Sequence, residues 1–441
     1  MASTDTMSLA DKGQRLGLRL IAKAGGLPGL KDKEVRAKVE RYLYKGAVTG
    51  FKAQTAAGRA FTKKQGSGDP ARAATAKPKP LFDLTPTEDQ QMIQGVAREL
   101  ADEVIRPAAA TADAERAVPA EVRTAAAEVG LHLVGVPAEL DGIAEERSAV
   151  TGAIVLEELA RGDMGIATAI MAPAAVATAI AAYGDADQQA TYLPEFTGET
   201  PPTAALALHE PQPLFDPFAL RTTGRVEGDE IVLDGVKAIV PGAEAADLFI
   251  VSAAIDGASR LVIVKPGTEG VKTEDDPAMG VRAAKTARLH LEGARVAKSD
   301  LLGTAEDHAD AVRRARLAWA AAAVGTSQAV LDHVSEYVKE RKAFGEPIGY
   351  RQAVAFTVSD IAIELAGLRL VVWKAAARLD RGEDASAEIA QVRSLVSRHA
   401  TWIGSSGVQL LGGHGFVKEF DNERWYRDLR GAGVLEGTLL V

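Results

Sequence analysis

The 441-residue sequence contains no cysteine. Disulfides, zinc–thiolate centres and iron–sulfur clusters are therefore excluded, and the composition is compatible with a reducing cytoplasm. Histidine is also scarce, and the seven histidines are scattered without the short spacing that is typical of metal ligands. We therefore expect no metal site. No apolar run approaches the length of a membrane span.

The formal net charge of −9 is unevenly distributed. Residues 1–80 hold 17 Lys and Arg against 6 Asp and Glu, so a basic arm precedes an acidic body. The arm lacks the continuous apolar stretch of a secretory signal, and Asp32, Glu34 and Glu40 argue against a transit peptide. We expect a bacterial cytoplasmic protein, with a mitochondrial location as the alternative, and no nucleic-acid partner. The arm is either a dock for a partner or a membrane surface, or a solvated appendage.

Changes in hydrophobic period divide the chain into four parts. Residues 1–83 form a basic extension that ends in a Gly- and Pro-rich linker, residues 84–203 a helical domain, 204–305 a β-domain and 306–441 a helical bundle. In the first helical domain, Thr85, Pro86 and Glu88 predict a capped helix start, and helical spacing continues to Arg106-Pro107. Further helices are expected at 119–129, 149–161, 166–183 and 185–197.

Short β-prone segments separated by Gly-containing turns follow from about residue 202. We expect strands at 204–208, 222–226, 230–233, 248–253, 261–264 and 287–291, in a small barrel or sandwich. From Asp307 onward, apolar residues step alternately by four and three, which predicts long antiparallel helices in a four-helix bundle. The expected fold is therefore multidomain α+β and not a doubly wound sheet. Gly413-x-Gly415 follows a helix and is no dinucleotide fingerprint.

Four segments, in the same order, resemble the acyl-CoA dehydrogenase family across roughly residues 84–438. They are Arg341-Lys-Ala-Phe344-Gly-Glu-Pro347 with Gln352, Gln409-Leu-Leu-Gly412-Gly413-His-Gly415-Phe, Arg427-Asp428 followed by Glu436-Gly437-Thr438, and Met279-Gly-Val-Arg282 leading to Leu301-Leu-Gly303. Each segment alone is a weak signal, but the four in sequence are specific. The chain thus looks like a family member with a basic N-terminal extension.

The resemblance implies an FAD-dependent oxidoreductase of fatty acid metabolism and β-oxidation, which converts an acyl-CoA thioester to its trans-2-enoyl form. It also implies a homo-oligomer, a dimer or tetramer, and an electron-transferring flavoprotein as electron acceptor. Glu436 corresponds to the family's general base, which removes the α-proton, while flavin N5 accepts the β-hydride. Some relatives carry the base directly before an arginine that corresponds to Arg316, but that position here is Ala315. Glu436 is therefore the only base of the family type.

The resemblance assigns further residues to cofactor and substrate. Arg341 would meet the FAD pyrophosphate of a neighbouring subunit, because a planar guanidinium suits phosphate. Phe344, Gln352, Gln409, Gly412, Gly413 and Thr438 would line the same dinucleotide. Gly437 would let the backbone approach the thioester. Arg316 would hold the mouth of the substrate pocket or contact the adenine side, or would form a structural ion pair in the bundle.

The middle domain departs from the family on the side that faces the flavin. The family's T-E-P-x-A-G-S-D reads here His209-Glu-Pro-Gln-Pro-Leu-Phe-Asp216, and its G-x-K-x-W-I-[ST] reads Gly235-Val-Lys-Ala-Ile239-Val-Pro241. The expected tryptophan is thus Ile239. Pro241 replaces the residue whose hydroxyl bonds the flavin, and proline also lacks a backbone N–H.

Three interpretations follow from this mixture. The chain is a working dehydrogenase whose FAD is held mainly by the bundle and a partner subunit. Alternatively, it is one subunit of a hetero-oligomer with an incomplete flavin site of its own. The third interpretation is a non-catalytic scaffold that binds acyl-CoA.

Overall fold

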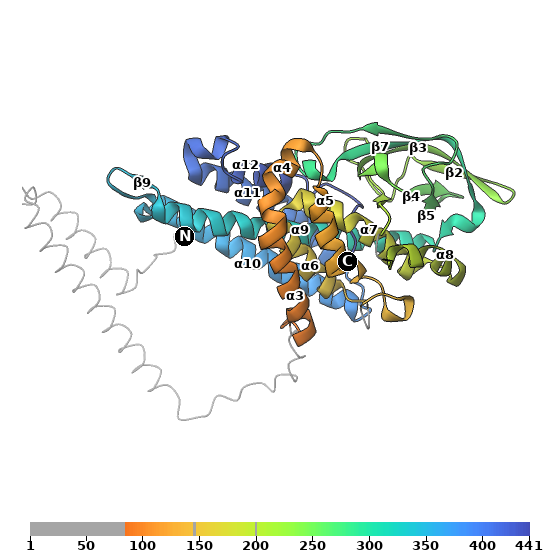
Figure 1. The fold of residues 1–441 in the computed structure, drawn as a ribbon, viewed down its shortest axis with the longest axis horizontal. Helices are drawn as coiled ribbons and strands as arrows, with labels where there is room; N and C mark the ends of the chain where they lie inside the picture. Colours follow the sequence, from red (N-terminus) through yellow and green to blue (C-terminus); the bar gives the residue numbers. More distant parts are fainter. Residues whose placement is uncertain (1–83, 144–146, 199–200) are drawn as a thin grey trace, which may run out of the picture. The chain divides into compact units, whose positions relative to one another are not determined.

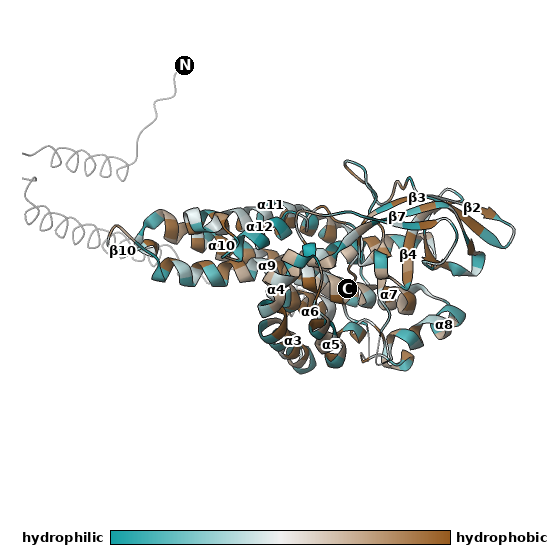
Figure 2. Cartoon of the chain, turned by 45° about the horizontal axis from the view of Figure 1, so that its top comes forward, coloured by the Kyte–Doolittle hydropathy of each residue, from teal (hydrophilic) through white to brown (hydrophobic). Residues whose placement is uncertain are grey.

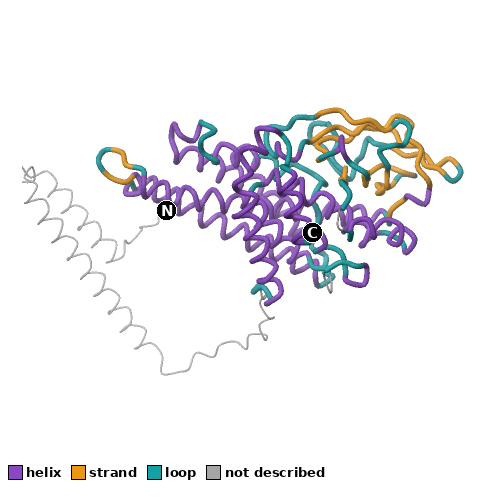
Figure 3. The backbone as a smooth tube through the Cα atoms, viewed as in Figure 1, coloured by secondary structure: helices purple, strands orange, loops and turns teal. Residues whose placement is uncertain are grey.

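The computed structural model describes residues 84–143, 147–198 and 201–441. The predictions for the basic extension and its linker, residues 1–83, therefore lie outside the described residues. The described residues belong to one compact unit. In that unit, helices gather around a central bundle and the strands lie together at one end, as Figures 1 and 3 show.

The N-terminal helices agree with the prediction, except at the first helix. Its N-cap is Thr87, whose side chain and backbone exchange hydrogen bonds with Gln90, and not Thr85 as the sequence suggested. The helix also does not end at Arg106-Pro107. α3 (Glu88–Leu100) continues through a π-helical turn (Ala101–Ile105) into α4 (Arg106–Glu115), and Pro107 is tolerated because it occupies the first turn of α4. α5 (Ala120–Val129), α6 (Ala149–Gly162), α7 (Met164–Tyr183) and α8 (Ala186–Phe196) follow.

Helix α7 is the one apolar element that sequence reading underestimated. Its 20 residues are long and apolar enough, by composition alone, to cross a membrane, so the statement that no run approaches this length was wrong. In the structure most of α7 is buried among the other elements, which identifies it as a core helix of the described unit. It separates the N-terminal helices from the sheet and packs against both.

The middle part is one eight-stranded sheet with the order β6-β7-β3-β2-β4-β5-β8, and β1 pairs with β4. The strands are β1 (Ala204–Ala207), β2 (Thr223–Glu227), β3 (Glu230–Pro241), β4 (Leu248–Ile255), β5 (Ala258–Val264), β6 (Val271–Asp275), β7 (Thr286–Ala297) and β8 (Leu301–Leu302). Two strands, β6 and β8, were not expected. β3 is far longer than predicted because a bulge lets it continue past Gly235 and Lys237 along β7.

The C-terminal part contains three long helices, α9 (Ala305–Glu340), α10 (Gln352–Asp380) and α11 (Ser386–Leu411), and the short α12 (Asn422–Leu429). The predicted apolar seam is buried between them: Ile361, Leu365, Leu368 and Val372 on α10 face Val392 and Val396 on α11. In Figure 2 the outer helices α10 and α11 show alternating hydrophobic and hydrophilic residues, as expected for helices with one solvated face. A hairpin of β9 (Lys342–Ala343) and β10 (Glu346–Pro347) projects at the end of the bundle away from the sheet (Figure 1).

Candidate active site

Glu436 lies where the C-terminal segment passes between the sheet and the bundle. The segment is pinned to β1, because the Thr438 N–H donates to the Leu206 carbonyl at 3.0 Å. On the other side, the indole N–H of Trp319 on α9 donates to the Gly437 carbonyl at 2.9 Å. Glu436 is only 2% exposed, so its carboxylate is almost completely removed from water.

The backbone around Glu436 requires glycine for a reason different from the one suggested by sequence. Gly437 has φ +75°, and a Cβ added there would lie 2.8 Å from the Cβ of Leu208. In this structure the close approach is therefore to Leu206 in β1 and to Leu208, which directly follows β1. Thr438 follows with φ +72°, an uncommon conformation for a residue with a side chain. Of the two apolar residues that precede Glu436, Leu435 is buried and Val434 is exposed.

Two arginines hold the Glu436 carboxylate. Arg316 donates from Nη2 to Oε1 at 2.7 Å and from Nε to both oxygens at 3.1 and 3.0 Å. Nη2 of Arg393, on α11, lies 2.7 Å from Oε1. Arg393 also donates to the Leu435 and Val434 carbonyls, each at 3.1 Å. Of the alternatives left open for Arg316, the structure contains the ion pair, and its partner is Glu436.

Burial lowers the pKa of the Arg393 guanidinium; the Glu436 carboxylate opposes this effect and the Arg316 charge adds to it. The nearby His209 is neutral at physiological pH, since burial and then the charges of Arg393 and Lys237 lower its pKa to about 4. Phe218 covers the other arginine, with its ring centroid 5.6 Å from Cζ of Arg316. The site is thus an arginine-rich cluster around one carboxylate.

Sequence reasoning missed three of these residues. Arg393 belongs to no motif. It lies on α11 between Val392 and Val396, whose apolar spacing it leaves unbroken, so the sequence gives no sign that it is functional. Phe218 lies two residues after the divergent segment His209–Asp216, outside every motif that the sequence analysis considered. Trp319 follows Arg316 by one helical turn, and this spacing was the one available signal that both side chains reach the same segment.

The residues predicted to bind the cofactor divide into two groups. Arg341, Phe344, Gln352, Gln409, Gly412 and Gly413 are all exposed and lie at the hairpin end of the bundle. Tyr337, one turn before Arg341, joins the end of α9 to the glycine turn, because its hydroxyl lies 2.8 Å from Nδ1 of His414. Thr438 alone lies with Glu436. Arg316 and Arg341 are separated by 25 residues of α9 and its C-cap, or roughly 37 Å at 1.5 Å per residue.

The two groups differ in how well they fit a flavin dinucleotide. At the hairpin end, the Arg341 side chain has no ion-pair partner among the described residues, and a Cβ at Gly412 or Gly413 would meet no atom within 4 Å. This surface fits an anionic dinucleotide. The strand face fits less well: Pro241 has no donor, and the Ile239 N–H, at φ +56°, already faces Asp276 Oδ2 at 3.4 Å.

Comparison with known proteins agrees with this architecture along the whole described unit. Family models match as acyl-CoA dehydrogenase N-terminal domain at residues 87–199, middle domain at 205–294 and C-terminal domain at 309–440. The chain belongs to the acyl-CoA dehydrogenase family. It is an oxidoreductase family whose cofactor is FAD, and the predicted fold class is confirmed.

Two curated relatives are each 33% identical to this chain and cover 80% of it. One is the 3-(aryl)acrylate reductase of Clostridium sporogenes, of which 96% is covered, and the other is the mitochondrial short-chain specific acyl-CoA dehydrogenase of Bos taurus, of which 87% is covered. A solved structure of PigA with FAD and proline has a TM-score of 0.74 at 23% identity, over 81% of this chain and 96% of that one. That likeness supports the fold.

Proposed function

We propose that this protein catalyses α,β-dehydrogenation of an acyl-CoA thioester, with Glu436 as the general base. The observation that carries the proposal is the burial of this one carboxylate between the sheet and the bundle, on a backbone fixed by Leu206 and Trp319. The α-proton of a thioester is weakly acidic, so a base must be held against it in a site that excludes water. Ala315, the other family position for a base, has no acidic group.

The two guanidiniums define what must happen when substrate binds. Both oxygens of Glu436 accept hydrogen bonds from Arg316, so one must be released before the carboxylate can accept a proton. We infer that the entering thioester displaces Arg316, which then remains near the pocket mouth, while Arg393 keeps the carboxylate in place through its bonds to the Leu435 and Val434 carbonyls. FAD, when bound, supplies the acceptor for the β-hydride.

The separation along α9 supports a site shared between subunits. Arg341 and the glycine turn lie too far from Glu436 to serve the same flavin within one chain, whereas a second copy can bring its hairpin end to this chain's Glu436. We propose a homo-oligomer of this kind. An acyl-CoA substrate, an electron-transferring flavoprotein as acceptor and a cytoplasmic location belong to the same proposal. Short acyl groups are favoured by the name of the bovine relative.

The base is tested by Glu436→Gln, which keeps the size of the side chain but cannot accept the proton. We expect retained FAD absorbance and a loss of turnover of about a thousandfold, which lies within the roughly 10²–10⁴-fold range that a general base contributes. Glu157→Gln is the matched control, because Glu157 is an equally buried glutamate that is bonded to an arginine, Arg369, away from the site. Turnover by Glu436→Gln at the rate of the control would disprove the role.

The shared site is tested by co-assembling two inactive variants, Arg341→Gln and Glu436→Gln. In a mixed dimer, one site receives both substitutions and the other receives neither, so activity should return to up to half of the wild-type value. Inactive mixed assemblies would show that both residues serve the same chain.

A second candidate function is a subunit of a hetero-oligomer, and the strand face favours it. Pro241 and the engaged Ile239 N–H leave the sheet with fewer flavin donors than the family pattern provides. In that case the protein purified alone would contain no FAD, and the cofactor would appear only after co-expression with a related chain. A yellow, active homo-oligomer would exclude this candidate.

A further inference from the structure

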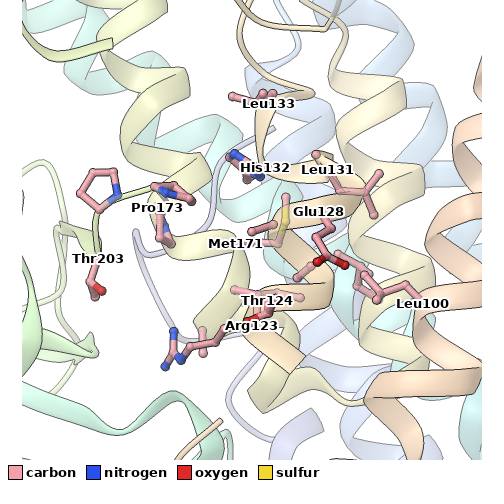
Figure 4. Close-up of a pocket in the computed structure, with 18 of the residues that line it drawn as sticks. Leu100, Arg123, Thr124, Glu128, Leu131, His132, Leu133, Met171, Pro173 and Thr203 are labelled. Carbon is pink, nitrogen blue, oxygen red and sulfur yellow. The ribbon is translucent and has the colours of Figure 1, made fainter. Parts of the chain in front are cut away.

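The side of Glu436 that is nearest to water is the side of its two arginines. The Glu436 side chain is 1% exposed, whereas those of Arg316 and Arg393 are 19% and 20% exposed. A cleft of about 830 Å³ between α5 and α7 is a separate feature, because none of its lining residues belongs to the cluster around Glu436 (Figure 4). Arg316 occupies both carboxylate oxygens, so a substrate that reaches the base has to move it.

Phe218, in the loop between β1 and β2, packs on this arginine. The guanidinium of Arg316 lies over the Phe218 ring, with Cζ 5.6 Å from the ring centroid. A cation in this position is attracted by the negative face of the ring. The contact is made while Arg316 is bonded to Glu436, so it stabilises the arrangement in which the carboxylate is occupied.

The Phe218 ring is itself held in place by the loop and by α9. The Phe218 N–H donates to Oδ1 of Asp216 at 3.0 Å, and the neighbouring Pro217 is buried. On α9, His308 meets the ring edge to face, with centroids 6.2 Å apart and an interplanar angle of 86°. Burial, and then the charge of Lys237, lower the pKa of His308 to about 4, so this neighbour is neutral at physiological pH and does not repel Arg316.

We propose that Phe218 is a positioning residue that holds Arg316 on Glu436 until the substrate enters. The inference rests on the proposed function of Glu436 as the base. A thioester that displaces Arg316 must break the contact with Phe218 together with the hydrogen bonds to the carboxylate. Apparent affinity falls with the fraction of protein in the competent state, so the Phe218 ring raises KM. It takes no part in the chemical step, because Arg316 has left the carboxylate by then.

The kinetic test uses the full chain with its FAD and butyryl-CoA as substrate. Phe218→Leu should lower KM by about two- to fivefold, the factor that corresponds to a cation–π contact at a partly exposed site, and should leave kcat unchanged. Phe218→Tyr should retain the wild-type KM, and Phe218→Trp should raise KM, because indole binds cations best. A substitution that merely deformed the loop would raise KM or lower kcat.

A second readout needs no turnover. Phenylglyoxal modifies accessible guanidiniums, and peptide mass mapping of the full chain gives its rate at Arg316. We expect this rate to rise by about two- to fivefold in Phe218→Leu and to fall in Phe218→Trp. The exposed Arg225 on β2 is the internal reference and should react equally in all variants. Leu214→Ala changes a fully exposed residue of the same loop and should match the wild type in both assays.

The two readouts separate the role of Phe218 from the proposed function. Equal modification of Arg316 in the wild type, Phe218→Leu and Phe218→Trp would overturn the proposal. An active protein in which Phe218→Leu leaves KM unchanged or raises it would do the same, as would equal effects of Leu214→Ala. If the wild type does not oxidise butyryl-CoA but the modification rates change as expected, the proposed function fails and the positioning role of Phe218 is supported.

Discussion

Lys237 and Glu210 form a fully buried ion pair beneath the candidate active site, and removing one partner should destabilise the protein strongly. Nζ of Lys237 lies 2.8 Å from Oε1 of Glu210 and 3.0 Å from Oγ of Ser252, while the Glu210 carboxylate accepts the N–H groups of Arg221 and Thr222. The pair thus ties β3 and β4 to the loop that follows β1. Lys237→Met leaves a buried carboxylate without its cation, which should cost about 3–5 kcal/mol in the free energy of unfolding.

The same pair predicts a pH dependence with a definite sign. Burial lowers the pKa of Lys237 to about 8, whereas an unfolded lysine titrates near about 10.4. Between these values the unfolded state holds a proton that the folded state has lost, so stability rises with pH in this window. At about 1.4 kcal/mol per pKa unit, the gain from Lys237 is about 3 kcal/mol.

Urea unfolding at pH 7 and pH 10 measures both effects, with Lys237→Met compared with the wild type at each pH. Other lysines titrate in the same range, but they contribute equally to both proteins and cancel in the difference. We therefore expect the stability difference between wild type and variant to grow by about 3 kcal/mol at the higher pH. A loss below about 1 kcal/mol at pH 7, or a difference that does not change with pH, would refute the reasoning.

Two further predictions concern other buried contacts. Burial and the neighbouring charge of Asp163 raise the pKa of Asp428 to about 7, so between about pH 4 and 7 the folded state holds a proton that the unfolded state lacks. The wild type should therefore lose stability relative to Asp428→Asn as the pH rises through this window. Melting temperatures of the two proteins that change in parallel with pH would contradict this. Gly325→Ala should lower the free energy of unfolding by about 1–3 kcal/mol or more, because a Cβ there would lie 1.9 Å from the Glu157 carbonyl oxygen. The control Gly95→Ala on α3, where a Cβ meets nothing within 4 Å, should raise the free energy of unfolding by up to about 1 kcal/mol. Equal shifts of the urea midpoint in the two variants would show that packing of α9 on α6 is not the cause.

Local patterns in the sequence were sufficient for most of the fold. The α9–α11 helices follow from an apolar seam that repeats over many turns, and such long periodic signals are rarely overridden. The predictions were wrong where the local sequence allows two alternatives, or where a structural feature leaves no pattern in the sequence. Thr85 and Thr87 both precede acidic or amide residues at capping distance, and only the tertiary position of α3 selects Thr87. The extension of β3 depends on a bulge, which leaves no periodic signal.

The candidate site was predictable in its residue types but not in its contacts. The motif around Glu436 identifies the carboxylate, yet nothing in the motif specifies that Arg393, 43 positions earlier, bonds to it. Side chains this far apart along the chain meet through tertiary packing alone. Gly437 illustrates the same limit, because its positive φ was predictable from its identity, while the neighbour that requires it, Leu208, was not.

The length of α9 connects the local chemistry to assembly. A rigid helix fixes Arg316 and Arg341 roughly 37 Å apart, so no side-chain motion within one chain can bring the hairpin end to Glu436. The exposed Phe344 and the open glycine turn at Gly412 and Gly413 can therefore share a site with Glu436 only if that Glu436 belongs to another copy of the chain. If a second copy supplies that contact, each flavin site draws its base from one chain and its phosphate-binding cation from the other. Catalysis would then depend on assembly, and dilution below the dissociation constant of the oligomer would abolish activity even though each chain remained folded.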